Sequence, residues 1–186
     1  MNRSPLLSLL MLIAGIAVLA LASRIAIPMA PVPITLQTLA VTVIGALYGW
    51  RLGVATVVAW LVLAVAGLPV LAEGASGIAR FTGASGGFLF AFPIAALCVG
   101  QLTESGVADR WVGAIAVMTA GTLICLTGGW LWLGARIGLG GAFAIGVAPY
   151  LAGALIKTLV GAAIVSGWRR SYRSSRNAAT SPRSTE

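Results

Sequence analysis

Long uncharged stretches alternate with short polar segments along the 186 residues of this chain. Charged residues divide it into six apolar windows, at residues 4–23, 25–50, 52–72, 81–103, 111–135 and 137–156. Each window can cross a bilayer as a helix, which takes about 20 residues. The windows lack the strict in-out alternation of barrel strands, and hydrocarbon does not tolerate unpaired backbone groups. The pattern therefore predicts an all-α integral membrane protein with six transmembrane helices.

Prolines, glycines and polar residues mark the expected connections between these helices. We place the helices at residues 5–27, 35–48, 52–66, 88–103, 111–133 and 143–168. Three prolines between residues 28 and 33 forbid a continuous helix, so we expect an ordered external loop there. The longest connection, residues 67–87, holds six glycines, and long irregular segments of this kind are usually lids or binding loops. A glycine-rich external turn is expected at residues 134–141.

The composition, 59% hydrophobic and 9% charged residues, excludes a soluble domain. The net charge of +8 raises the possibility of nucleic-acid binding, but the charges cluster at the helix ends. With a cytoplasmic amino terminus, eight of the twelve Lys and Arg residues lie inside: Arg3, Arg51, Arg110, Arg169, Arg170, Arg173, Arg176 and Arg183. This asymmetry predicts that both termini are cytoplasmic and argues against nucleic acid as a partner. We expect a multi-pass protein of the plasma (inner) membrane.

The chain thus divides into a transmembrane domain, residues 1–168, and a basic tail, residues 169–186, that we expect to be disordered. An alternative for the first helix is a signal peptide cleaved near Ala20-Leu21-Ala22. The apolar stretch is long for a signal peptide, whose core has about 7–15 residues, and an even helix count needs the helix retained.

Metal, nucleotide and enzymatic chemistry find little support in the sequence. The chain has no histidine, and its two cysteines, Cys98 and Cys125, lie in apolar windows without ligand-like spacing. We therefore expect no metal site and no cofactor. No phosphate-binding loop of the G-x-x-x-x-G-K-[ST] type is present, so an ATP-driven step must belong to another chain. A membrane enzyme needs an acid-base pair, and among membrane-facing groups only Lys157 qualifies.

Lys157 is the strongest candidate for a functional side chain, because it lies in the middle of the last predicted helix. An ionisable group inserted there costs about 2.5–3.5 kcal/mol, so it normally faces the bundle interior and meets a partner or a ligand. The alternative is that the side chain extends toward the cytoplasmic face near Trp168. The acidic residues are all expected in loops, turns or the tail, so an anionic or polar ligand can complete the pairing.

Two other regions carry candidate ligand contacts. Thr35 and Gln37 begin the second helix. The Gln37 side chain can donate and accept hydrogen bonds at once, which suits an amide or ureido group in a ligand. Helix capping by Thr35 and interhelical hydrogen bonding by Gln37 explain the two residues equally well. Ser85, Gly86 and Gly87 open the fourth helix with free backbone N–H groups, although tight packing explains the glycines about as well. Glu73 and Arg80 either close over a ligand from the preceding loop or form an exposed ion pair.

Small residues in the first helix form a surface that another helix can approach closely. They include Ala14, Gly15, Ala17 and Ala22. Internal packing and docking of a partner subunit both remain open.

Several motifs together resemble the BioY family, the biotin-specific substrate-binding subunits of energy-coupling-factor (ECF) importers. Residues 31–38 look like the family's PVPxTLQT signature, residues 67–70 like its GLPVF segment, and residues 83–89 like GPTGGYL. Residues 146–157, from Gly146 to Lys157, are similar to GVxPFxxGDLIK. The chain departs from these motifs at Ala84 and Phe88, in place of Pro and Tyr, and at Ala154, where the family has an acidic residue.

The resemblance implies a non-enzymatic subunit that captures biotin near its external face, beneath the first and third interhelical loops. It places Phe88 and Tyr150 with the other ligand-binding candidates. The implied partners are a transmembrane coupling protein and two ATP-hydrolysing subunits. A sister subunit for another small vitamin, a membrane enzyme and a structural membrane component remain as alternatives.

Overall fold

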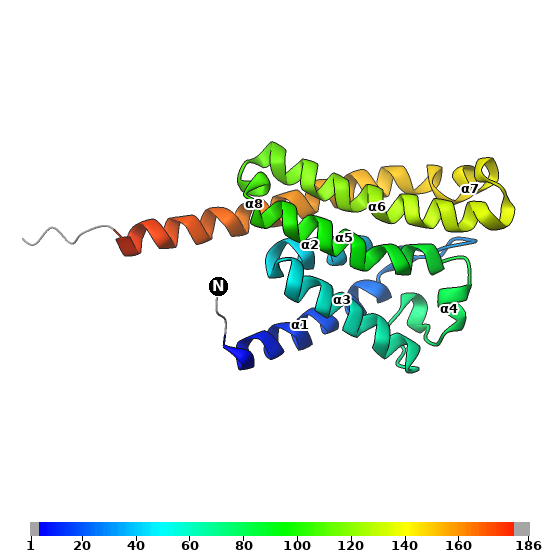
Figure 1. The fold of residues 1–186 in the computed structure, drawn as a ribbon. Helices are drawn as coiled ribbons and strands as arrows, with labels where there is room; N and C mark the ends of the chain where they lie inside the picture. Colours follow the sequence, from blue (N-terminus) through cyan, green and yellow to red (C-terminus); the bar gives the residue numbers. More distant parts are fainter. Residues whose placement is uncertain (1–3, 181–186) are drawn as a thin grey trace, which may run out of the picture.

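The computed structural model describes the backbone of residues 4–180 and the side chains of residues 4–171. Helices make up most of this part of the chain (Figure 1). The longer helices are α1 (Pro5–Arg24), α2 (Gln37–Tyr48), α3 (Trp50–Val65), α5 (Gly86–Glu104), α6 (Trp111–Ile137), α7 (Leu139–Gly146) and α8 (Leu151–Thr180). The short elements are β1 (Ala26–Ile27), β2 (Ile34–Thr35), η1 (Ala72–Gly74), α4 (Ala79–Thr82), η2 (Val107–Asp109) and η3 (Ala148–Tyr150). The expected all-helical class is confirmed.

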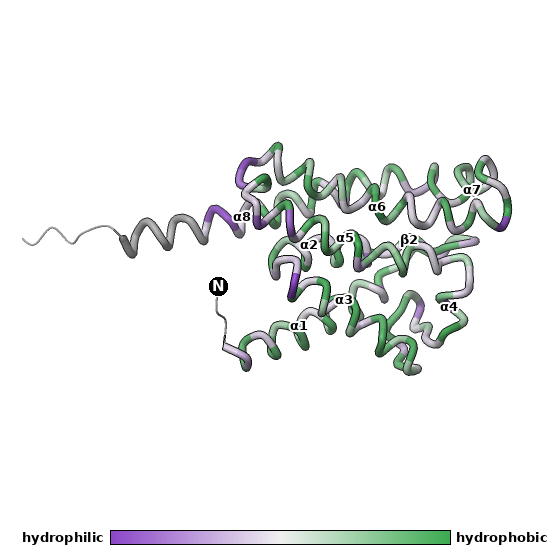
Figure 2. Tube along the Cα trace, viewed as in Figure 1, coloured by the Kyte–Doolittle hydropathy of each residue, from purple (hydrophilic) through white to green (hydrophobic). Residues whose placement is uncertain are grey.

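The membrane character follows from the length and hydropathy of these helices. In the described part of the chain, α1, α5, α6 and the segment Leu139–Ser171 are each long and apolar enough to span a bilayer. The apolar helices α2 and α3 are shorter, with 12 and 16 residues. Apolar residues dominate the helices in Figure 2, and hydrophilic residues gather near helix ends. Four spans are thus supported directly, and a count of six stays a prediction.

Helix α5 lies at the centre of the bundle, where it packs against α2, α3 and α6. Small residues allow these contacts, since a Cβ atom at Gly45 of α2 would lie 2.8 Å from the Ala96 carbonyl oxygen of α5. A Cβ atom at Gly100 would lie 2.5 Å from the backbone of Trp50. Lipid tails give helices no hydrophobic reason to associate, so close packing of this kind holds a membrane bundle together.

The first helix ends earlier than expected, at Arg24 rather than Ile27. Residues 26–27 instead form β1, which pairs with β2 in an antiparallel hairpin that matches Ala26 with Thr35. The prolines between the two strands favour extended backbone, and the short ladder satisfies peptide groups that a helix would have paired internally. Helix α2 accordingly starts at Gln37, two residues later than expected.

The last expected helix is broken, and the one before it is longer. Helix α6 continues to Ile137, and the turn expected over residues 134–141 reduces to Gly138, at φ +84°. Helix α7 follows at once and ends at Gly146, and α8 begins after η3. The prediction of one helix over residues 143–168 is therefore wrong. Pro149 explains the break, because it has no N–H to donate and clashes with a preceding helical turn.

Two further boundaries differ from the expectation. Helix α3 starts at Trp50, because Gly49 alone, at φ +80°, makes the turn after α2. The connection 67–87 contains η1 and α4, and α5 begins within it at Gly86.

The expected disordered tail is wrong for residues 169–180, where α8 continues without interruption to Thr180. No glycine or proline occurs between Trp168 and Thr180, so nothing in this stretch forces the helix to end. The rest of the expected tail, residues 181–186, lies outside the described residues, as does Arg3.

Candidate functional site

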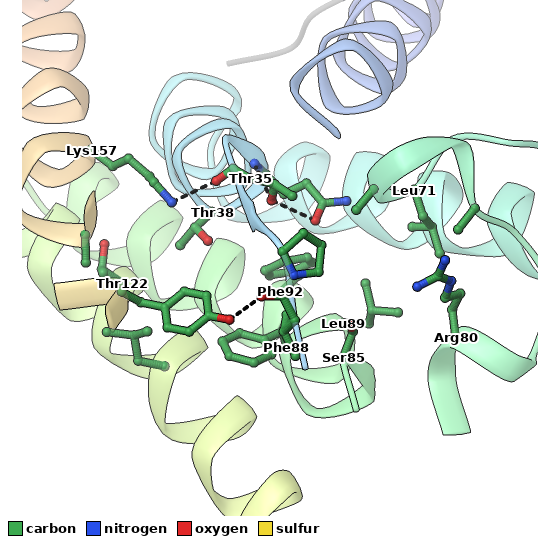
Figure 3. Close-up of a pocket in the computed structure, with 18 residues that line it drawn as sticks. Thr35, Thr38, Leu71, Arg80, Ser85, Phe88, Leu89, Phe92, Thr122 and Lys157 are labelled. Carbon is green, nitrogen blue, oxygen red and sulfur yellow. Dashed lines mark hydrogen bonds between the residues drawn. The ribbon is translucent and has the colours of Figure 1, made fainter. Parts of the chain in front are cut away.

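A pocket lies at the hairpin end of the bundle, between the hairpin, α5, α6 and α8 (Figure 3). Its wall is mostly apolar and carries a few polar and charged side chains, as is usual for small-molecule sites. Its lining residues are Val32, Pro33, Thr35, Gln37, Thr38, Leu71, Ala72, Ala75, Arg80, Ser85, Phe88, Leu89, Phe92, Thr122, Leu126, Tyr150, Ala154 and Lys157. Segments far apart in the sequence thus meet around one cavity.

Seven of the ten residues expected at a ligand site line this pocket. They are Thr35, Gln37, Arg80, Ser85, Phe88, Tyr150 and Lys157. The other three, Glu73, Gly86 and Gly87, do not.

Lys157 is half-buried, and its Nζ atom donates a hydrogen bond of 2.7 Å to the backbone carbonyl of Thr35 in β2 (Figure 3). The side chain therefore reaches across the pocket wall to the hairpin and does not extend toward Trp168. Among the residues that line the pocket, Lys157 and Arg80 are basic and none is acidic. The cavity is thus suited to an anionic or carbonyl-bearing ligand.

Thr35 and Gln37 are buried and hydrogen-bonded to each other as well as to helix α1. The Thr35 hydroxyl donates to Gln37 Oε1 at 3.0 Å and accepts from the Gln37 backbone N–H at 3.3 Å. Gln37 Nε2 donates to Ser23 Oγ of α1 at 2.9 Å. The Thr35 hydroxyl thus accepts from the first backbone N–H of α2, and the Gln37 side-chain amide joins α2 to α1. Both residues also line the cavity.

Two aromatic residues form the wall between the hairpin and α5. Tyr150, placed by η3, donates its hydroxyl to the carbonyl of Val32 in the loop that joins β1 and β2. The centroid of its ring lies 6.3 Å from the ring centroid of Phe88, which belongs to the first turn of α5. The helix break at Pro149 therefore contributes to the site, because it brings Tyr150 within reach of the hairpin.

The glycine pair that opens α5 is used for packing. A Cβ atom at Gly86 would lie 2.0 Å from the Phe81 carbonyl oxygen, and one at Gly87 would lie 2.3 Å from the Gly128 carbonyl oxygen of α6. Both glycines are buried and neither lines the pocket, so the structure supports the packing explanation.

Glu73 and Arg80 do not act as an ion pair over the pocket. Glu73 is exposed in η1, at φ +58°, and among the described residues it makes no salt bridge to Arg80. Of the two residues, only the arginine lines the cavity.

The small residues of α1 divide between two faces. Gly15 is buried where a Cβ atom would lie 2.6 Å from Thr56 Cγ2 of α3, and Ala22 packs partly against the core. Ala14 and Ala17 are exposed. Internal packing thus explains two of the four residues, and the other two remain available to a partner.

Several pocket residues were absent from the expected set. Thr122 of α6 lines the cavity, and its hydroxyl lies 3.2 Å from that of Thr158 in α8. Leu71 and Phe92 supply apolar surface. A hydroxyl in the middle of an apolar window is a signal for Thr122, whereas the aliphatic and aromatic residues cannot be told from ordinary packing residues in the sequence.

The chain is similar in sequence to known transporters. The chain is 31% identical to the probable biotin transporter BioY of Pyrococcus horikoshii over 144 residues, 76% of this chain and 83% of that protein. It is 33% identical to the biotin transporter BioY2 of Lactococcus lactis subsp. cremoris over 165 residues, 86% of this chain and 88% of that protein.

A solved structure, described as the S-component for biotin from an ECF-type ABC transporter, superposes on this chain with a TM-score of 0.83. The two are 27% identical, and the match covers 91% of this chain and 94% of the other. The sequence model of the BioY family matches residues 1–174, which include the hairpin, every residue that lines the pocket and α8 as far as residue 174. By sequence and by fold, this chain belongs to the BioY family.

Proposed function

We propose that this protein is the biotin-binding uptake subunit of an ECF-type importer and that it captures biotin in the pocket at the hairpin end. The relatives above are biotin transporters, and the similar structure is a biotin S-component. The observation that carries the proposal is a pocket with Lys157 and Arg80 in its wall and no acidic lining residue.

The chemistry of the lining matches the parts of biotin. The vitamin has a carboxylate at the end of an aliphatic chain, an apolar thioether ring and a ureido group. Lys157 and Arg80 are cations for the carboxylate or the ureido oxygen, and hydroxyl and amide groups, such as those of Thr35, Gln37 and Thr38, are hydrogen-bond partners. Phe88 and neighbouring apolar residues cover the ring and chain.

The proposed orientation places the pocket outside and both termini in the cytoplasm, with six spans of the plasma membrane. Arg51 at the start of α3 and Arg110 before α6 lie at the ends of the helices away from the hairpin, together with Arg169 and Arg170 of α8. Arginine at this end follows the positive-inside rule. The short helices α2 and α3 then serve as the remaining two spans.

The proposed partners are a transmembrane coupling subunit and ATP-hydrolysing subunits, because the sequence has no phosphate-binding loop of its own. The similar structure comes from an ECF-type ABC transporter. Ala14 and Ala17, on the exposed face of α1, are the proposed docking positions. In this assembly the chain binds and carries its ligand and catalyses no reaction.

A second candidate is a binding subunit for another small vitamin. Ala154 lines the pocket where the family motif has an acidic residue, so this wall lacks one charged contact. Tritiated-biotin binding to membranes that contain the protein, with biotin, thiamine, riboflavin and pantothenate as competitors, separates the two candidates. Displacement by unlabelled biotin alone supports the proposed function. Absence of saturable biotin binding, or stronger displacement by another vitamin, contradicts it.

A further inference from the structure

Ser23 of α1 does not line the pocket, yet it is bonded to a residue that does. Its side chain is 0% exposed. Its hydroxyl donates to the Leu19 carbonyl at 2.7 Å and accepts from Gln37 Nε2 at 2.9 Å. The buried Ser23 side chain thus joins α1 to α2.

These bonds determine how the Gln37 amide is turned. A serine hydroxyl has one proton, and that proton is used on Leu19, so Ser23 can only accept from Gln37. The amide nitrogen must therefore face Ser23, and the amide oxygen must face Thr35, whose hydroxyl donates to it at 3.0 Å.

The reversed amide would form fewer bonds. Gln37 Nε2 would then donate to Thr35, and Ser23 would have to turn its proton from Leu19 toward Gln37 Oε1. Three side-chain bonds in the observed arrangement would become two. Without Ser23, each arrangement keeps one bond, to Thr35, and the amide has no preferred direction.

We infer that Ser23 is a positioning residue that makes this wall of the pocket a hydrogen-bond acceptor and thereby selects ligands with N–H donors. The Thr35 proton is used on Gln37, so the remaining capacity of Thr35 Oγ1 and Gln37 Oε1 is lone pairs. Both residues line the cavity. In the absence of any acidic lining residue, these two oxygens are well suited to the N–H groups of a ureido ring.

This inference rests on the proposed function, and its test compares biotin with an analogue that lacks the donors. In the cyclic carbonate analogue, oxygen atoms replace the two ureido N–H groups at similar size. Dissociation constants for both ligands are measured by calorimetry on the full chain. The wild-type protein should prefer biotin, and Ser23→Ala should reduce the preference about tenfold, because the freed amide can donate to the carbonate.

A second substitution separates positioning from folding. In Ser23→Ala/Gln37→Glu, a carboxylate presents an oxygen whichever way it turns, so the preference for biotin should return. Ser166→Ala, which removes a buried hydroxyl of α8 outside the pocket, is the matched control and should keep the wild-type preference.

Equal weakening of both ligands by Ser23→Ala, an unchanged preference, or no recovery in the double variant would overturn the inference. Absence of biotin binding by the wild-type protein would instead overturn the proposed function.

Discussion

Lys157 and Thr35 lie 122 positions apart in the chain, and the lysine Nζ atom donates to the threonine carbonyl at 2.7 Å. This bond joins α8 to the β hairpin at the wall of the pocket. The partner is a neutral carbonyl, so the cation keeps hydrogen-bonding capacity for a ligand: an ammonium group has three protons to donate. The contact gives the charged group a hydrogen-bond partner inside an apolar helix, where an unpartnered charge is costly.

Replacing this cation should weaken ligand binding. We expect Lys157→Met, which keeps most of the side-chain volume, to raise the biotin dissociation constant about 10- to 100-fold, the loss typical of a charged hydrogen bond. Arg170→Gln removes an exposed cation of the same helix and is the control. Equal affinities in Lys157→Met and the wild-type protein would show that the lysine has no role in binding.

Glu73 should be dispensable for binding. It is exposed and does not line the pocket, in contrast to the expectation from its loop position. Glu73→Gln should leave the biotin dissociation constant within about twofold, since surface substitutions usually change free energies by less than about 0.5 kcal/mol. A larger loss in the same calorimetric titration would mean that η1 moves over the ligand.

Tyr150→Phe should loosen the hairpin while it keeps the aromatic wall. The change removes the hydroxyl that donates to the Val32 carbonyl and retains the ring beside Phe88. We expect a loss of about 1 kcal/mol in stability, measured by thermal unfolding in detergent. Faster proteolysis between residues 28 and 33 should accompany it. An unchanged unfolding temperature and cleavage rate would contradict the assigned contact.

Gly87→Ala should destabilise the bundle. The added Cβ atom would lie 2.3 Å from both the Gly128 carbonyl oxygen and Trp132 Cβ, so α5 and α6 must separate. Overpacking of this kind costs about 1–3 kcal/mol. Gly167→Ala, at a glycine with nothing within 4 Å of the added atom, should leave the unfolding temperature unchanged or slightly higher. Equal effects of the two changes would argue against close packing at Gly87.

The end of the bundle away from the hairpin provides a test of α8 packing. Arg169 pairs with Asp109 and donates to the Thr103 carbonyl at 2.5 Å, which ties α8 to η2 and α5. A double-mutant cycle of Arg169→Gln and Asp109→Asn should show a coupling of about 1 kcal/mol in unfolding free energy. Additive effects of the two substitutions on the unfolding free energy would mean that the ion pair contributes nothing to stability.

The fold class followed from the sequence because uncharged windows and proline positions report directly on lipid exposure and backbone geometry. The prolines at 28, 31 and 33 marked the end of the first helix to within three residues. The break at Pro149 was missed, because membrane helices often tolerate a proline and hydropathy does not register it. The helical extension to Thr180 was missed because a polar composition resembles that of a disordered tail.

Two kinds of site residue could be predicted from the sequence. Lys157 is a charged residue in an apolar helix, where a charge without a partner is energetically costly, and Thr35 and Gln37 belong to a motif. Gly86 and Gly87 belonged to a motif as well, but packing explains them. Ser23 and Thr122 gave only weak signals, because hydroxyl groups in membrane helices usually bond to their own backbone. Which of them meets another helix depends on the tertiary arrangement.

Calorimetric titration of biotin into the purified, detergent-solubilised protein decides whether the pocket binds biotin, with Ala154→Asp measured in parallel. We expect saturable binding of one biotin per chain by the wild-type protein. No binding by the wild-type protein, with binding recovered in Ala154→Asp, would contradict it and identify a family member whose pocket serves a different ligand.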